Sequence, residues 1–267
     1  MQLRSEQQQA RIALACLDLT SLNDNDDEAA IDALCRKART PWGNVAAVCV
    51  WPRLAAHARQ QLPPQIQVAA VANFPHGSSD VSSVLTDVRT ILNAGAQEID
   101  VVLPYRQLLA GDVQAVERLL RAVREASPGM RLKVILETGI LATPKLITLA
   151  AEIGLDCGAD FLKTSTGKTP VSATEQAARC ILTSIAKRGL IAASLGFKPS
   201  GGIRKVADAA VYMRLQEEFL GVGSLQPQRF RIGASSILDN IASILVASPQ
   251  GPLAPMHSGR DRREDLY

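Results

Sequence analysis

The sequence has few residues that could build a disulfide framework or a metal centre. Its five cysteines are scattered along the chain and include no C-x-x-C pair, which indicates reduced thiols in a cytoplasmic protein. The three histidines, His57, His76 and His257, show no metal-ligand spacing between any two of them. A metal site needs a cluster of histidines, cysteines or carboxylates, so we expect none here.

Long apolar runs and a strong charge of one sign are also missing. No segment reaches the roughly 18 apolar residues of a membrane helix, and the first residues lack the apolar run of a signal peptide. The net charge is only +3, whereas nucleic-acid-binding domains are usually far more basic. We therefore expect neither a membrane nor a nucleic acid as partner. A small phosphate compound would need only a local positive site.

Glycine patterns that bind nucleotides are absent as well. No G-x-G-x-x-G follows the first predicted strand. The segment 166–169 (TGKT) resembles the end of a P-loop, but Leu162 occupies the position where that motif needs a glycine. We treat this similarity as chance and do not expect a nucleotide site.

The sequence does contain a regular alternation of short apolar runs and helical patterns. Runs such as Ala46–Val50 and Ile99–Leu103 are apolar on both faces, as in parallel strands buried on both sides. Strands are predicted near residues 17–20, 46–50, 66–73, 98–103, 132–137, 160–164, 194–198 and 230–233. Helices are predicted over residues 26–38, 79–92, 113–126, 143–153, 173–187, 207–219 and 237–246.

Eight strands alternating with helices predict either a closed (β/α)₈ TIM barrel or an open doubly wound sheet. The missing dinucleotide motif favours the barrel, which commonly takes roughly 250 residues as one domain. We therefore predict a single-domain α/β TIM barrel over residues 1–247. Residues 248–267 hold three prolines, two glycines and a mixed charge run, and they are predicted to be a flexible tail.

Polar residues stand at nearly every predicted strand end, which is where the chemistry of a barrel gathers. Three of them are lysines inside apolar segments: Lys133, Lys163 and Lys198. Lysine is almost never buried without a partner, so one such lysine alone would indicate a solvated strand end or a salt bridge. Three of them beside Asp100 and Glu137 indicate an active site.

A lysine that attacks a carbonyl must be neutral, although its free pKa is about 10.4. Burial and a second nearby cation both lower such a pKa. We therefore predict that Lys163 is a nucleophile that forms a Schiff base and that Lys198, one strand further, is the second cation. Asp100 is predicted to hold Lys198 and to shuttle protons with it through water.

Two loops rich in glycine and serine follow the last two predicted strands, where barrels often bind phosphate. They are 199–202 (PSGG) and 233–236 (GASS). Either loop alone would fit a turn followed by a helix N-cap. Together, at the two expected places, they predict a phosphate site. In such a site the glycines let the backbone approach an anion, and the serine hydroxyls add donors.

These motifs, in this order, resemble the deoxyribose-phosphate aldolase family. The resemblance runs from about Leu17 to Leu245. It rests on the segments LDLTSLND, NVAAVCVWP, VANFPHG, EIDVVLPYR, KVILETG, DFLKTSTGK, GFKPSGGIR and RIGASS. It implies a TIM barrel that reversibly cleaves 2-deoxyribose 5-phosphate to acetaldehyde and glyceraldehyde 3-phosphate in deoxyribose phosphate catabolism. No metal or organic cofactor is implied, because the iminium ion takes the place of a metal.

The resemblance also implies roles for individual residues. Lys163 matches the family's Schiff-base lysine, Lys198 its second lysine, and Asp100 its relay aspartate. Pocket positions are matched by Asp18, Cys49 and Thr166. Phosphate positions are matched by Lys168, Gly201, Gly202, Gly233, Ser235 and Ser236. A terminal tyrosine assists proton transfer in some members, and Tyr267 ends this chain after a tail of different character.

Several alternatives stay open. Cys49 is either a reactive thiol or, as is commoner, a small buried hydrophobe. A Schiff-base aldolase on the same barrel could act on a longer sugar phosphate. A sugar-phosphate binding protein would keep both phosphate loops without turnover. A homodimer would fit exposed barrel helices, but the sequence identifies no interface.

Overall fold

Eight parallel strands form a nearly closed ring in the computed structural model, which describes residues 4–247. The strands are β1 (Leu17–Thr20), β4 (Ala47–Val50), β5 (Gln67–Ala72), β6 (Glu98–Val102), β7 (Arg131–Ile135), β8 (Phe161–Lys163), β9 (Gly196–Lys198) and β10 (Ile232–Ala234). They pair in the order β10-β1-β4-β5-β6-β7-β8-β9. Parallel bridges Phe197–Phe230 and Ser200–Gly233 join β9 to the β10 side and complete the ring. The predicted (β/α)₈ TIM barrel is therefore confirmed.

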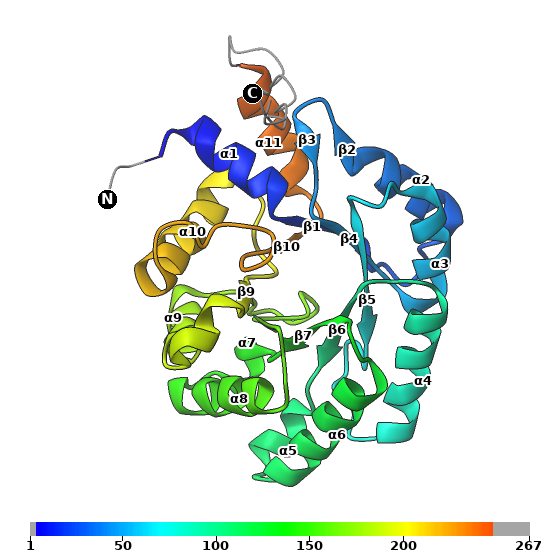
Figure 1. Ribbon diagram of the computed structural model, residues 1–267, viewed down its shortest axis with the longest axis vertical. Coiled ribbons are helices and arrows are strands. Elements are labelled where there is room, and N and C mark those ends of the chain that lie inside the picture. The colour runs from blue at the N-terminus through cyan, green and yellow to red at the C-terminus, as the bar shows by residue number, and fades with distance from the viewer. Residues whose placement is uncertain (1–3, 248–267) are drawn as a thin grey trace, which may run out of the picture.

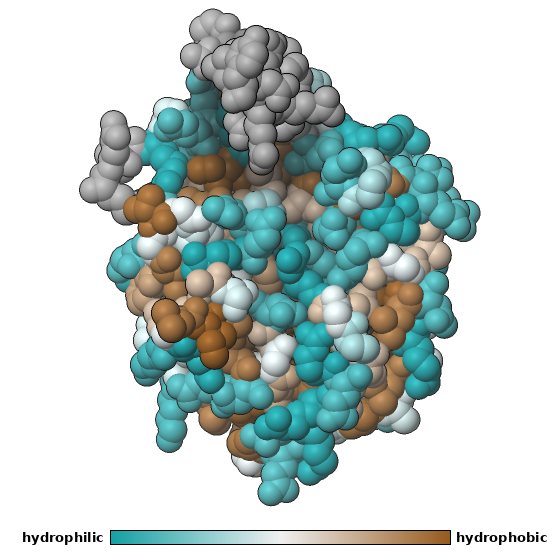
Figure 2. All heavy atoms as spheres, in the orientation of Figure 1, coloured by the Kyte–Doolittle hydropathy of each residue, from teal (hydrophilic) through white to brown (hydrophobic). Residues whose placement is uncertain are grey.

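Helices surround the barrel, as Figure 1 shows. They include α2 (Glu28–Lys37), α3 (Pro52–Gln61), α4 (Val81–Asn93), α6 (Val113–Ala126), α8 (Pro144–Asp156), α9 (Glu175–Ala186), α10 (Val206–Leu220) and α11 (Ile237–Val246). Helix α6 is typical, because Val116, Leu119, Leu120 and Val123 recur at helical spacing and are fully buried. Hydrophilic residues cover much of the outer surface in Figure 2, with hydrophobic ones between them. Within residues 4–247 no helix is long and apolar enough to span a membrane.

Some short elements were not predicted. They are α1 (Glu6–Ala15), the hairpin of β2 (Arg39–Thr40) and β3 (Gly43–Asn44), α5 (Tyr105–Leu109), α7 (Thr138–Leu141) and the 3₁₀ helix η1 (Gly189–Ala193), in addition to α3. The strand predicted from Ser194 begins only at Gly196, because Ser194 ends η1. Glu137, predicted as a strand end, lies beyond β7 with a φ of 54° at the start of α7. The tail predicted over residues 248–267, with Tyr267, lies outside the described residues.

The barrel interior carries charged side chains where barrels usually hold bulky aliphatic ones. Asp18, Asp100, Lys133 and Lys198 are fully buried within it. The opposite side of the interior is lined by small residues of β4 and β5, where Cys49, Ala69 and Val71 form an apolar cluster with Leu22. One side of the barrel is therefore charged and the other is apolar, and the candidate site lies where they meet.

Candidate active site

Four charged side chains from four strands meet inside the barrel. Asp18 belongs to β1, Asp100 to β6, Lys163 to β8 and Lys198 to β9, and each is at most 2% exposed. Lys163 and Lys198 are direct partners in the parallel register of β8 and β9, at the last residue of each strand. Side chains at paired positions point to the same face of a sheet, here the inside of the barrel. The structure thus brings together the three residues predicted to carry the chemistry.

Asp100 is the common acceptor of three lysines. Its Oδ2 accepts from Lys163 Nζ at 2.9 Å and from Lys198 Nζ at 2.7 Å, and its Oδ1 accepts from Lys133 Nζ at 2.6 Å. Burial alone would raise the pKa of this carboxyl, but the charges of the three lysines hold its pKa well below the usual range. Asp100 is therefore ionised, and the nitrogens of Lys163 and Lys198 lie within two hydrogen-bond lengths of each other.

Lys198 connects two carboxylates. Its Nζ donates to Asp18 as well as to Asp100. Burial acts to lower the pKa of Lys198, but Asp100 and Asp18 outweigh it and raise the pKa above its usual value. At Asp18 burial acts to raise the pKa, and the charges of Lys198 and Arg231 prevail and lower it. Lys198 is thus a fixed cation beside Lys163, which is the arrangement that its predicted role needs.

A cavity of about 390 Å³ opens over these residues, between the loops that follow β1, β8, β9 and β10. Lys163 lines this cavity, whereas Lys133 and Lys198 do not and are fully buried. Asp18, Cys49 and Asp100 also stay out of its wall. The predicted residues that line it are Lys163, Thr166, Lys168, Gly201, Gly202, Gly233, Ser235 and Ser236. The predicted nucleophile and the predicted phosphate ligands therefore share one cavity.

The two glycine-rich loops turn tightly beside the cavity. Gly201 and Gly202 have φ angles of 84° and 79°, a region that favours glycine. A Cβ on Gly233 would approach Ser200 Oγ to 2.7 Å, so that position also needs glycine. Ser236 precedes α11 without making a side-chain cap hydrogen bond. The hydroxyl of Ser236 therefore does not cap the helix, which was the alternative to phosphate binding.

Two positive side chains also line this cavity. Lys168 Nζ donates to the carbonyl oxygen of Leu22 at 2.7 Å, across the gap between the loops after β8 and β1. Arg204, an exposed residue of the loop after β9, also lines the cavity. Sequence reasoning missed Arg204 as a site residue, although it ends the GFKPSGGIR motif. An arginine two residues after a glycine pair at a strand end was the available signal.

Glu137 organises the loop after β8. It is fully buried, and its Oε2 accepts from Thr166 Oγ1 at 2.5 Å. Its Oε1 accepts from the Thr166 amide and from Thr169 Oγ1, each at 3.3 Å. Thr166, which matches a pocket position of the family, therefore already donates its own hydroxyl proton to Glu137. Its oxygen also accepts from the Lys168 amide at 3.1 Å, which orders the cavity wall.

Cys49 lies at the boundary between the apolar cluster and the charged residues. It is fully buried, with its Sγ 3.9 Å from Asp100 Oδ2. Burial, with the neighbouring Asp100 carboxylate, raises the pKa of this thiol. Because a thiolate is the reactive form, the structure favours the small buried hydrophobe over the reactive thiol.

A deeper set of charges lies beneath the cavity. Glu98 accepts from Lys133 Nζ at 2.6 Å and from Arg231 Nη2 at 2.7 Å, and Arg231 also donates to Asp18 at 2.5 Å. Glu98 and Arg231 were not predicted as site residues. Lys133 was expected at the active face, but it lies two residues before the end of β7 and so projects deeper into the barrel. We call Asp18, Glu98, Asp100, Lys133, Lys163, Lys198 and Arg231 the charged cluster.

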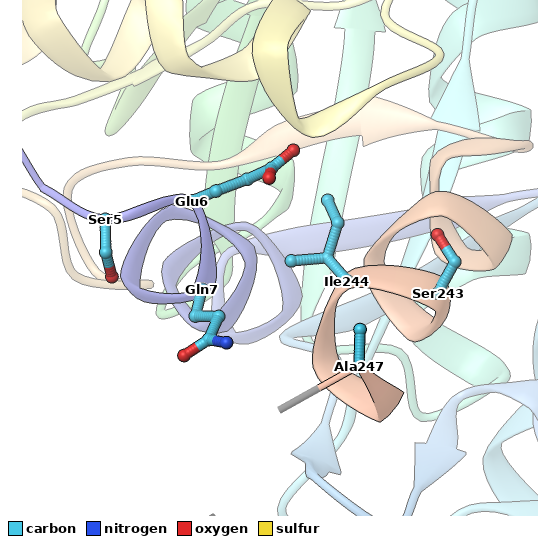
Figure 3. Close-up of a pocket in the computed structure, with 6 residues that line it drawn as sticks. All are labelled: Ser5, Glu6, Gln7, Ser243, Ile244 and Ala247. Carbon is cyan, nitrogen blue, oxygen red and sulfur yellow. The ribbon is translucent and has the colours of Figure 1, made fainter. Parts of the chain in front are cut away.

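A second depression lies outside the barrel. It measures about 490 Å³ and is lined by residues of α1 and α11 and their caps (Figure 3). None of the buried charged side chains reaches it, so we do not regard it as the active site. Within residues 4–247, no group of three or more His, Cys, Asp or Glu side chains is placed to hold a metal ion.

Comparisons with known proteins agree with this architecture. Residues 12–228 match the family model described as DeoC/LacD family aldolase. A solved structure from Coccidioides immitis, provisionally named deoxyribose-phosphate aldolase, is 28% identical, with a TM-score of 0.78 over 88% of this chain and 86% of that one. A similarly named structure from Toxoplasma gondii is 26% identical, with a TM-score of 0.82 over 91% of this chain and 98% of that one.

The family model spans most of the chain, including the strands that carry Asp18, Asp100, Lys163 and Lys198. The structural neighbours share the barrel over nearly their whole lengths. The chain therefore belongs to the DeoC/LacD family of aldolases.

Proposed function

We propose that this aldolase reversibly cleaves 2-deoxyribose 5-phosphate to acetaldehyde and glyceraldehyde 3-phosphate through a Schiff base on Lys163. One observation carries the proposal. Lys163 borders the same cavity as the Gly201–Gly202 and Ser235–Ser236 loops, and its Nζ is hydrogen-bonded to a carboxylate that also holds a second lysine. A substrate with an aldehyde at one end and a phosphate at the other fits such a cavity.

Of the three buried lysines, Lys163 is the one suited to attack. Lys133 contacts carboxylates of Asp100 and Glu98, and Lys198 contacts Asp100 and Asp18, so both stay protonated. Lys163 contacts Asp100 and also borders the cavity. A substrate carbonyl therefore meets Lys163 first.

The charged cluster holds more cations than carboxylates. With every group ionised, the charged cluster has four cations against three carboxylates, a net positive charge in a buried place. Such a charge is costly because burial disfavours ions that lack a partner. Lys163 is the amine of the cluster that borders the cavity, so the proposed reaction uses it as the nucleophile.

The reaction begins when the neutral amine of Lys163 attacks C1 of the open-chain sugar phosphate. The carbonyl oxygen gains protons through Asp100, Lys198 and water, and it leaves as water to give an iminium ion. The C3 hydroxyl then loses its proton, the C2–C3 bond breaks, and its electrons pass into the iminium to form an enamine. Glyceraldehyde 3-phosphate departs. Protonation of the enamine on C2 and addition of water release acetaldehyde and restore Lys163.

The phosphate end of the cavity contributes orientation. The backbone amide of Gly202, the hydroxyls of Ser235 and Ser236, and the N-terminus of α11 can bind the phosphate. The Gly201 amide can join them if it gives up its 3.5 Å contact with the Gly233 carbonyl. Remote binding of this kind holds C1 in reach of Lys163 and supplies energy that the reacting end can use. Lys168 and Arg204 add positive charge there.

Borohydride trapping tests the proposal directly. The intact protein is incubated with acetaldehyde and borohydride, and peptide mass spectrometry locates the reduced adduct. We expect it on Lys163 and expect it to vanish in Lys163→Met. An adduct on another lysine would end the assignment. Turnover of longer ketose phosphates over deoxyribose 5-phosphate would favour the alternative aldolase, and phosphate-dependent binding without any adduct would favour a binding protein.

A further inference from the structure

Lys133, which lies deeper in the barrel, fixes the orientation of the Asp100 carboxylate. Its Oδ2 faces Lys163 and Lys198, and its Oδ1 accepts from Lys133 at 2.6 Å. Asp100 and Lys133 are also direct partners in the register of β6 and β7. Because Lys133 occupies Oδ1, the Asp100 carboxylate cannot rotate without breaking this bond, and Oδ2 stays beneath Lys163.

Lys133 is itself fixed by Glu98. The Lys133 Nζ–Glu98 Oε2 distance is 2.6 Å, and both side chains are at most 1% exposed. Glu98 in turn accepts from Arg231 inside the barrel and from Arg131 Nη1 at 2.9 Å. The side chain of Arg131 is 32% exposed, so this row of contacts leads from the cavity to solvent away from the substrate.

Lys133 contributes a charge in addition to a contact. It does not line the cavity, so it cannot touch the substrate, and the proposed reaction assigns it no step. Its positive charge is nevertheless one of the four that outnumber three carboxylates in the charged cluster. Removal of that charge would balance the cluster with Lys163 still protonated, whereas removal of a carboxylate would increase the excess.

We propose that Lys133, held by Glu98, is a positioning residue that fixes the Asp100 carboxylate and sets the pH at which Lys163 becomes a nucleophile. The inference rests on the proposed Schiff-base function. The groups that surround Lys163 and Asp100 come from every neighbouring element. They are Asp18 of β1, Cys49 of β4, Glu98 of β6, Lys133 of β7, Lys198 of β9, Arg231 beside β10, and Glu137, Lys168 and Arg204 of the cavity loops.

The direction of each expected effect follows from charge. Lys133→Met removes a cation, so Lys163 retains its proton to higher pH. Glu98→Gln removes a carboxylate, so Lys163 loses its proton at lower pH. Lys133 acts on Lys163 across the Asp100 carboxylate, and Glu98 lies one contact further away. We therefore expect shifts of about one pH unit or less, larger for Lys133→Met than for Glu98→Gln. Arg131→Met acts from further away and in solvent, so its effect has the sign of Lys133→Met and a smaller size.

The experiment measures the initial rate of borohydride-trapped adduct on Lys163 against pH, with acetaldehyde and the full chain. We expect the acid limb of this pH–rate profile to move to higher pH in Lys133→Met, to lower pH in Glu98→Gln and slightly to higher pH in Arg131→Met. The control is Lys145→Met on the exposed start of α8, in which the acid limb should stay in place. A purely structural role would not move two variants in opposite directions. In addition, kcat should fall in Lys133→Met with KM for the phosphorylated substrate little changed.

Each outcome is decisive. Absence of the Lys163 adduct in the unmodified protein would refute the proposed function and this inference together. A normal adduct with acid limbs that stay in place, or that move in the same direction in Lys133→Met and Glu98→Gln, would overturn this inference alone. If circular dichroism shows that these buried variants do not fold, the partly exposed Arg131→Met decides, since an unmoved limb there contradicts the proposal.

Discussion

Lys163 Nζ and Lys198 Nζ donate to one and the same oxygen atom, Oδ2 of Asp100. Two amines that compete for a single acceptor cannot both be optimally stabilised as cations. Lys198 has a second carboxylate in Asp18, whereas Lys163 opens to the cavity. The shared oxygen thus links the charge of one lysine to the reactivity of the other.

Replacing Lys198 tests this link. In Lys198→Leu the cation next to Lys163 is gone, so we expect the acid limb of the kcat/KM profile to move to higher pH. Turnover at neutral pH should fall about tenfold for each pH unit of displacement. Lys145→Leu, on the exposed surface, is the matched control. A folded Lys198→Leu protein with an unchanged profile would refute the role given to Lys198.

Asp100 should also govern stability against pH. Its folded pKa is depressed, so its contribution is present above the unfolded value of about 3.9 and is lost as pH falls from there. Asp100→Asn leaves three lysines without this charge, and we expect a loss of about 3–5 kcal/mol in the free energy of unfolding at pH 7. The difference in free energy of unfolding between this variant and the unmodified protein should narrow between about pH 4 and pH 2.

Urea unfolding at a series of pH values measures this difference. Asp112→Asn is the control, because Asp112 caps the exposed start of α6 and asparagine caps helices as well as aspartate does. If Asp100→Asn lost no more stability than the control, the conclusion that Asp100 is ionised and paired with the lysines would be wrong.

The phosphate loop can be tested apart from the chemistry. Ser235→Ala removes one exposed hydroxyl of the cavity, worth about 1 kcal/mol or a several-fold change in affinity. We expect KM to rise for 2-deoxyribose 5-phosphate and to stay unchanged for unphosphorylated 2-deoxyribose. Ser243→Ala, on α11 and away from this cavity, is the control. Equal effects on both substrates would argue against a phosphate contact at Ser235.

Metal removal should leave the activity intact. In the proposed mechanism the iminium ion accepts the electrons of the broken bond, so no step calls for a Lewis acid. After incubation with EDTA and gel filtration, we expect the aldol cleavage rate to be unchanged. A loss of activity that zinc or magnesium restored would contradict the mechanism.

Gly196 should be intolerant of a side chain. A Cβ there would lie 2.3 Å from the ring of Phe161. The guanidinium groups of Arg131 and Arg231 also contact this ring, each 5.8 Å from its centre. Overpacking of this kind costs about 1–3 kcal/mol. We expect Gly196→Ala to lower the melting temperature and Phe161→Leu in the same chain to recover part of the loss. A fully stable single variant would show that the ring can move aside.

The sequence predicted the strands and main helices well, because their patterns are strong. Helix α6 begins and ends as predicted, since Asp112 caps it and Ser127 follows an unbroken amphipathic pattern. Helix α1 was missed because its apolar residues are mostly alanines and its polar residues are glutamines. The capping box of Ser5 and Gln8 was the signal that could have revealed it.

The site was predicted in part. The lysines and Asp100 stood out because charge inside an apolar run is unusual, and the family resemblance supported their roles. The depth of a side chain in the barrel could not be predicted in this way, because it depends on the stagger of the strands. Lys133 was therefore grouped with Lys163 and Lys198 at the active face, although it lies deeper and contacts Asp100 and Glu98. Glu98 and Arg231 were missed because their ion pair joins strands far apart in sequence. A homodimer and a cytoplasmic location stay predictions.

The charged filling of the barrel has a consequence for how this chain tolerates change. Buried ion pairs add little net stability, so cohesion must come from the aliphatic contacts between the strands and the ring of helices. The outward side chains of the strands thus stabilise the fold, and the inward side chains of the same strands carry the chemistry. Exchange of a whole inward ion pair, which leaves no charge unpaired, can therefore change the reactivity while the outward residues keep the protein together.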